Sequence, residues 1–148
     1  MLDATMTRLR LALCLLPLVT AGCSGNNIWN TPTPLTVPFS FTDLRVGLGA
    51  MAATNQTVTV NYTGWLYSNT APDNKGAQFD TSIGRGPFEF TIGASQVIRG
   101  WERGVPGMRI GGKRKLVLPP EDAYGSNGSG SIPPNATLVF EIDLLTVQ

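Results

Sequence analysis

One short stretch carries the spacing of an α-helix, and it limits what the chain can fold into. The stretch is QVIRGWERGV, residues 96–105. Its large apolar residues recur at i, i+3 and i+7: Ile98, Trp101 and Val105. Gly100 and Gly104 interrupt it, each at a cost of about 1 kcal/mol relative to alanine, and Pro106 ends it. We therefore expect one short, weak helix over residues 99–105 that its surroundings must stabilise.

The rest of the chain beyond residue 40 has the patterns of β-strands. TVTVNYTGWLY, residues 57–67, alternates and is rich in β-branched and aromatic residues, which favours a strand. Similar patterns predict further strands over residues 41–46, 87–92, 113–119 and 136–147. SNTAPDNKG, residues 68–76, predicts a loop. Several antiparallel strands and one helix indicate an α+β fold, with a twisted sheet packed on the helix.

The absence of histidine from all 148 residues excludes several kinds of chemistry. A Ser-His-Asp triad, a Cys-His pair, histidine metal ligands and a histidine pH switch are impossible. Phosphate-binding glycine motifs and CxxC are also absent, and we expect no cofactor and no metal. Two carboxylate pairs occur, Glu121 with Asp122 and Glu141 with Asp143. The second pair lies at i, i+2 on one face of a strand, which favours a solvated edge over an acid–base pair.

The N-terminal segment predicts export. Basic Arg8 and Arg10 precede an apolar run, residues 11–19, that is too short to span a bilayer. TAGC, residues 20–23, resembles a bacterial lipobox, in which the cysteine is acylated and becomes the mature N-terminus. We interpret residues 1–22 as a lipoprotein signal peptide, Cys23 as a lipidation site, and the location as periplasm or envelope membrane. The alternative is a plain signal peptide, with Cys23 removed or left free.

We expect residues 23–40 to form a flexible tether, because alternating Pro and Thr precede the first strand. Residues 41–148 are expected to form one folded domain. Removal of residues 1–22 leaves nine basic and nine acidic groups. A neutral chain offers no basic field for nucleic acid, so we expect no nucleic-acid partner. The run KRK, residues 113–115, is interpreted as the solvated part of a strand.

Six blocks of sequence, in this order, resemble the FKBP-type peptidyl-prolyl cis–trans isomerases: VNYTGWL, AQFDTS, GPFEFTIG, QVIRGWERGVPGM, PPEDAYG and SIPPNATLVFEIDLL. The resemblance covers residues 41–148. It implies a strongly twisted antiparallel sheet of about five strands wrapped around one short α-helix. It also implies isomerisation of Xaa-Pro bonds, with proline-containing polypeptides as substrates and macrolides as inhibitors.

The resemblance also assigns a pocket. Trp101 matches the indole on which family members seat the proline ring, Tyr124 the hydroxyl that bonds a ligand carbonyl, and Asp80 a wall carboxylate. The implied catalytic residues are Tyr62, Asp80, Trp101, Tyr124 and Phe140. The implied substrate-binding residues are Phe79, Phe88, Val97, Ile98 and Ile132, the last as a flap over the pocket. On pattern alone, Phe140 on an alternating strand would be an ordinary core residue, and Phe39 and Phe90 are interpreted as structural.

Two other functions remain open at this stage. The first is a peptide-binding or holdase module, anchored in the envelope, whose catalysis is incidental. The second is a structural lipoprotein, which has no need for a pocket. We expect an enzyme assisting the folding of exported proteins, acting as a monomer and meeting the membrane only through its N-terminal lipid.

Overall fold

The computed structural model describes residues 37–148, so the predicted signal peptide, Cys23 and most of the tether lie outside the described residues. Six strands form one antiparallel sheet in the order β1-β5-β6-β2-β3, with β4 also paired to β2. The strands are β1 (Ser40–Arg45), β2 (Thr57–Tyr67), β3 (Lys75–Thr81), β4 (Phe88–Thr91), β5 (Lys113–Leu118) and β6 (Leu138–Val147). The helix is α1 (Arg99–Gly104), and two short 3-10 turns are η1 (Pro72–Asn74) and η2 (Pro120–Asp122).

The α+β prediction is confirmed, and the strand predicted over residues 57–67 matches β2 residue for residue. The sequence analysis missed β3, whose first two residues fall in the predicted loop. The segment KGAQFDT lacks an alternating apolar pattern and buries none of its residues. It is extended because its backbone pairs with the edge of β2, which no local pattern reports. β1 begins at Ser40, inside the segment predicted as tether.

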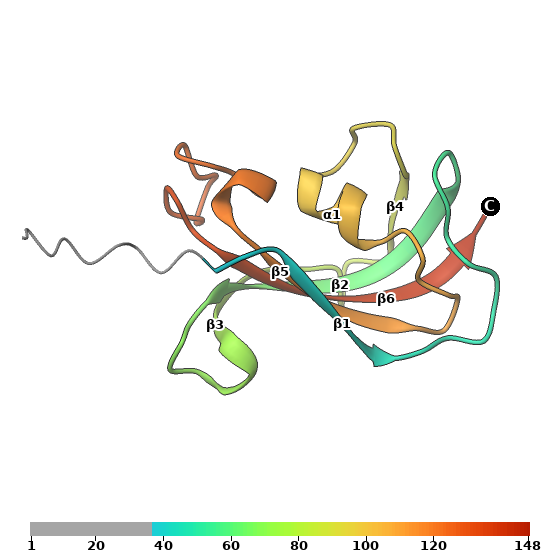
Figure 1. Cartoon of the computed structure of the whole chain (residues 1–148), viewed down its shortest axis with the longest axis horizontal. Helices are drawn as coiled ribbons and strands as arrows, with labels where there is room; N and C mark the ends of the chain where they lie inside the picture. Colours follow the sequence, from blue (N-terminus) through green and yellow to red (C-terminus); the bar gives the residue numbers. More distant parts are fainter. Residues whose placement is uncertain (1–36) are drawn as a thin grey trace, which may run out of the picture. The chain divides into compact units, whose positions relative to one another are not determined.

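Helix α1 lies over one face of the sheet, with the chain before it and the chain after β5 on either side (Figure 1). Two glycines allow it to approach closely. A Cβ on Gly100 would lie 2.5 Å from Leu118, and a Cβ on Gly104 would lie 2.7 Å from Leu116. Both leucines belong to β5 and are fully buried. The glycines that weaken the helix in isolation therefore permit the packing that holds it.

The core lies between α1 and the sheet. Every second residue of β2, β5 and β6 faces the helix, as the two-residue period of a strand requires. The largest fully buried members are aliphatic, with Phe90 from β4: Val58, Val60, Leu116, Leu118, Leu138, Ile142, Leu144 and Ile92. Trp101 and Phe140 belong to the same cluster, so the predicted site is continuous with the core.

The interpretation of residues 113–115 as solvated is wrong for Arg114. Its position on β5 faces the helix, and the residue is only 5 % exposed. The guanidinium bonds both carboxylate oxygens of Asp43, at 2.6 and 3.0 Å, and donates to the carbonyls of Gly104 and Pro106. It also lies 4.4 Å from the ring centroid of Phe41. A buried charge is tolerated there because each of the three guanidinium nitrogens has a partner, and two of the acceptors are carbonyls at the C-terminal end of α1.

Glu141 and Asp143 do not lie at a sheet edge, because β6 is between β5 and β2. They face away from the helix and join an ion-pair network on the outer side of the sheet. Lys75 bonds Glu141 at 2.5 Å, while Lys113 and Arg45 bond Asp143 at 3.1 and 3.0 Å. Each carboxylate is matched by cations, so this pair has a structural role and no acid–base arrangement. Among residues 37–148, no helix has the length and apolar character needed to cross a bilayer.

We expect Gly100→Ala to lower the free energy of unfolding by up to about 2 kcal/mol. Alanine improves helix propensity by about 1 kcal/mol, but overpacking against buried Leu118 costs about 1–3 kcal/mol. Chemical denaturation of the two proteins measures the difference. Leu118→Val in the Gly100→Ala background should recover part of the loss, and an Ala variant more stable than wild type would contradict the close approach.

Candidate active site

A cavity of about 430 Å³ is lined by residues from four strands, from α1, from the loop before the helix and from the segment after η2. Nine of the ten residues assigned to the pocket from the sequence line it: Tyr62, Phe79, Asp80, Phe88, Val97, Ile98, Trp101, Tyr124 and Phe140. Ser95 and Gln96 also line it and were missed. Ile132 is not among the lining residues; it is buried in the core cluster, 7 % exposed.

Trp101 is the centre of the aromatic wall. Its indole meets Tyr62 and Phe140 edge to face, with ring centroids 5.1 and 5.4 Å apart and interplanar angles of 80° and 89°. Phe88 and Phe90 contact it at 6.2 and 5.7 Å. Such tilted contacts are the favoured geometry for aromatic pairs. Four rings from three strands thus fix the indole, which is only 4 % exposed.

The neighbouring residues Phe79 and Asp80 both line the cavity, although successive side chains of a regular strand point to opposite faces. The pairing of β3 with β2 explains this. Gly64 is opposite Asp80 and Trp65 is opposite Gln78, so Phe79 is an extra residue in the ladder. This β-bulge turns the strand locally and brings an apolar ring and a carboxylate to one site.

Gly64 makes room for two of the cavity's aromatic rings. A Cβ at this position would lie 2.6 Å from Phe79 and 2.8 Å from Phe140, closer than real contacts allow. These two rings meet edge to face at 5.5 Å, directly over the glycine backbone. Gly64 lies in the VNYTGWL block, but the sequence assigns it no role, because a glycine in a strand indicates only that another group packs closely against the backbone.

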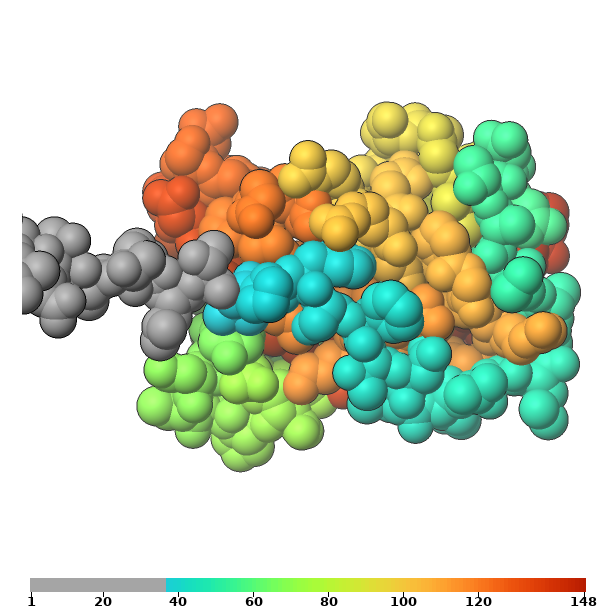
Figure 2. Space-filling view, in the orientation of Figure 1, coloured from blue at the N-terminus to red at the C-terminus, as the bar shows by residue number. Residues whose placement is uncertain are grey.

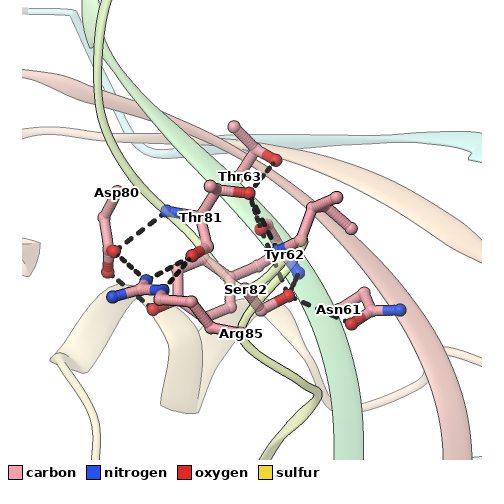
Figure 3. Close-up of polar contacts among 8 residues, drawn as sticks. Asn61, Tyr62, Thr63, Asp80, Thr81, Ser82 and Arg85 are labelled. Carbon is pink, nitrogen blue, oxygen red and sulfur yellow. Dashed lines mark hydrogen bonds and ion pairs between the residues drawn. The ribbon is translucent and has the colours of Figure 1, made fainter.

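The polar side of the cavity is a network around Asp80 (Figure 3). The Tyr62 hydroxyl donates to Asp80 Oδ2 at 2.6 Å, and the Thr81 backbone N–H donates to Oδ1 at 2.9 Å. Arg85 forms an ion pair with the same carboxylate and donates from Nε to the Thr81 carbonyl at 2.7 Å. The Thr81 hydroxyl in turn donates to the Tyr62 carbonyl at 3.0 Å. Asp80 therefore has donors on both oxygens before any ligand binds.

These contacts set the protonation states. Burial raises the pKa of Tyr62 to about 12, and the hydrogen bond to Asp80 and its negative charge add to the rise. Burial by itself would raise the pKa of Asp80, but hydrogen bonds from Tyr62, Arg85 and the Thr81 N–H outweigh it and lower that pKa. At neutral pH Tyr62 is protonated and Asp80 is ionised. Asp80 is thus a fixed wall charge, unsuited to taking up a proton.

The rim of the cavity is held by Glu102 of α1, which the sequence analysis also missed. Its two carboxylate oxygens accept the backbone N–H groups of Gly93 and Ser95, at 2.6 and 3.0 Å. Gln96 Oε1 accepts from the Thr91 N–H at 2.8 Å. These bonds fix the loop that carries Val97 and Ile98. The only sequence signal for this role of Glu102 is an acidic residue one position after Trp101, with a glycine-containing loop upstream.

Tyr124 closes the cavity from the segment after η2. Burial raises the pKa of its hydroxyl, and the nearby charge of Asp80 adds to this, so the hydroxyl remains a donor at neutral pH. The site therefore combines an apolar, aromatic floor with a hydroxyl that can donate a hydrogen bond from the wall. The described residues hold no cluster of three or more acidic, cysteine or histidine side chains that could bind a metal ion. The arrangement can enclose a compact apolar ring and orient an adjoining carbonyl.

Comparison with known proteins identifies relatives with this architecture. A family model described as FKBP-type peptidyl-prolyl cis-trans isomerase matches residues 49–145. The FK506-binding protein of Neisseria meningitidis serogroup B is 48% identical over 107 residues, which are 71% of this chain and 92% of that protein. FK506-binding protein 1 of Gibberella zeae is 46% identical over 104 residues, 70% of this chain and 92% of that protein.

Two solved structures share the fold. The crystal structure of AtFKBP13 has a TM-score of 0.64 and 36% identity, covering 74% of this chain and 93% of that one. The crystal structure of FkpA from Escherichia coli has a TM-score of 0.63 and 41% identity, covering 74% of this chain and 48% of that one. These matches lie in the part of the chain that builds the cavity.

Replacing Asp80 by asparagine should lower the pKa of Tyr62 from about 12, because the charge that favours the neutral phenol is lost and the amide oxygen is a weaker acceptor than the carboxylate. The value should remain above that of free tyrosine, since burial persists. Absorbance titration of tyrosinate, with Tyr62→Phe to identify the transition, measures it. An unchanged pKa would contradict the network.

Wild type and Asp80→Asn also test how ionisation of Asp80 changes the free energy of unfolding. Because folding lowers the pKa of Asp80, its ionisation stabilises the fold above about pH 4, and this is lost as pH falls through the folded-state pKa. The stability difference between wild type and Asp80→Asn should therefore shrink on acidification.

Proposed function

Because the chain belongs to the FKBP-type peptidyl-prolyl cis-trans isomerases, we propose that the cavity floored by Trp101 is where its isomerisation of Xaa-Pro bonds takes place. Family members bind proline-containing peptides and FK506-type macrolides. A proline ring is a compact apolar group, and it fits against the indole between Tyr62, Phe88 and Phe140. Val97 and Ile98 lie at the rim, where the polypeptide on either side of the proline would leave the cavity.

The reaction needs no covalent step. The planar Xaa-Pro bond crosses a barrier of about 18–20 kcal/mol, in which amide resonance is lost as the bond twists. The twisted amide is less dipolar than the planar one, so transfer from water to an apolar cavity favours the transition state over the ground state. An aromatic wall with few exposed polar atoms is therefore itself the catalyst, which is why the chain needs no histidine.

The polar residues orient the substrate. The Tyr124 hydroxyl donates to a carbonyl next to the proline and holds one side of the chain while the other rotates. Asp80 keeps the Tyr62 ring in place by accepting a hydrogen bond from its hydroxyl, and an ion pair with Arg85 fixes Asp80. None of these groups transfers a proton in this scheme. The observation that carries the assignment is the cage of four rings around Trp101, which places an apolar floor inside an open cavity.

A holdase without catalysis is not favoured, because a binding module has no need for a rigid, deep floor and relies on broad apolar surface. The loop between Tyr124 and Pro133 is GSNGSGSI, residues 125–132, and consists almost entirely of small residues. Small residues leave the outer side of the cavity open, and Ile132 is turned into the core instead of covering it. We infer that the cavity accommodates substrates with bulky residues next to the proline, while the proline ring still rests on the Trp101 floor.

Trp101→Leu should lower kcat/KM for an Xaa-Pro peptide at least tenfold and weaken macrolide binding in parallel, because the flat aromatic floor on which the proline ring would sit is lost while most burial remains. A protease-coupled or NMR exchange assay measures the rate. Trp65→Leu is the matched control, since Trp65 lies on β2 outside the cavity lining and packs under Lys75. Wild-type turnover at the uncatalysed rate would refute the enzyme; intact turnover in Trp101→Leu would refute the site.

We further propose that the protein acts outside the cytoplasm as a monomeric lipoprotein and assists the folding of exported proteins. Support comes from the basic and apolar N-terminal segment, the TAGC sequence at residues 20–23, and the polar stretch that separates Cys23 from β1. Slow Xaa-Pro isomerisation limits folding wherever a chain must fold after crossing a membrane.

Mass spectrometry of the mature N-terminus tests the anchor. We expect an acylated Cys23 and recovery in the membrane fraction, whereas Cys23→Ala should yield a soluble, unacylated protein. The isomerase rate of Cys23→Ala should match wild type, because Cys23 lies outside residues 49–145 that match the family. An unmodified, soluble wild-type product would end the lipoprotein proposal.

A further inference from the structure

Two walls of the cavity come from segments that the backbone does not join. Trp101 lies on α1, and Tyr124 follows η2. Among the backbone hydrogen bonds of residues 37–148, none links α1 to residues 119–125. Yet a hydroxyl can bond a carbonyl only within a narrow range of distance and angle. Something must fix Tyr124 relative to the indole on which the proline would sit.

Asp122, two residues before Tyr124, is the polar link between these segments. It is 1% exposed, one of three buried polar or charged residues in the described chain. Its Oδ1 accepts from Arg99 Nε at 2.5 Å, and its Oδ2 accepts from Arg103. The two arginines are four residues apart on α1, so they lie on one face of the helix, with Trp101 midway between them in sequence.

Further contacts fix both sides of the ion pairs between Asp122 and the two arginines. The Arg103 guanidinium lies 4.1 Å from the ring centroid of Phe39, so it is fixed between an aromatic face and the carboxylate. Figure 2 shows the first described residues, around β1 and in cyan, against the helix segment, in gold, and the orange segment after β5. Within η2, the N–H groups of Ala123 and Gly125 both donate to the Pro120 carbonyl, at 3.0 and 2.8 Å. Tyr124 therefore sits in a closed turn whose start is bonded to the helix.

We propose that Asp122 is a positioning residue, which holds the Tyr124 hydroxyl at a fixed place relative to Trp101. A buried ion pair adds little net stability against an apolar replacement, but its geometry is specific, so it selects one arrangement of the parts it joins. Arg99 and Arg103 bind one oxygen each, which fixes both the distance of the turn from α1 and its rotation. This inference rests on the roles proposed above for Trp101 and Tyr124.

A double-mutant cycle between Asp122→Asn and Tyr124→Phe tests it, with kcat/KM for an Xaa-Pro peptide as readout. In the wild-type background, Tyr124→Phe should lower kcat/KM about fivefold, as expected for one lost hydrogen bond. Asp122→Asn should lower it by up to about the same fivefold, because a misplaced hydroxyl forfeits at most what its removal forfeits. In the Asp122→Asn background, Tyr124→Phe should change kcat/KM less than about twofold, since a misplaced hydroxyl contributes nothing to lose.

A general loss of stability would not give this result, because it leaves the effect of Tyr124→Phe intact in the folded molecules. Asp143→Asn is the matched control: it removes a carboxylate that also pairs with two cations, Arg45 and Lys113, on the outer face of the sheet. The full fivefold effect of Tyr124→Phe should persist in that background. Circular dichroism at the assay temperature confirms that each variant is folded.

An effect of Tyr124→Phe that is undiminished in the Asp122→Asn background overturns the inference while leaving the site intact. Unchanged kcat/KM in Tyr124→Phe alone refutes the role of Tyr124 and the inference together. If Asp122→Asn does not fold, Arg103→Lys replaces it in the cycle, since lysine keeps the charge beside Asp122 but loses the planar contact with Phe39. Its cycle should show a reduced effect of Tyr124→Phe, and a full effect refutes the proposal.

Discussion

The close approach of α1 to β5 is the constraint on which the rest of the structure depends. A six-residue helix cannot stabilise itself, and two internal glycines weaken it further. Those glycines let the backbone come within contact distance of Leu116 and Leu118, which brings Trp101 into the aromatic cluster. A longer or bulkier helix would stand farther from the sheet, and the indole would then no longer meet rings from three strands.

Charged side chains fix this short helix at its margins, while its centre is apolar. Arg114 reaches the carbonyls at its C-terminal end, Glu102 holds the loop at its start, and Asp122 joins its outer face to the turn before Tyr124. The directional contacts lie outside the cavity, where they impose geometry without adding polarity to the floor. This separation lets one small domain have a rigid site whose floor is still apolar.

The sequence predicted the secondary structure that has strong local patterns. β2, with its β-branched and aromatic alternation, matches its prediction, and so does the location of the weak helix. It missed β3, because that strand carries no apolar period and exists through pairing with β2. It also placed Arg114 in solvent, since strand alternation shows that neighbours face opposite sides but not which side the core occupies.

By itself, the sequence determined the fold class through its local patterns, and its resemblance to the family assigned nine of the eleven residues that line the cavity. These follow from local residue order, which persists whether or not the chain is folded. Only the tertiary structure decided the bulge that turns Phe79 and Asp80 to one side, the space above Gly64, and the burial of Ile132. Each depends on register and on contacts between residues far apart in the chain, and such contacts have no counterpart in a local pattern.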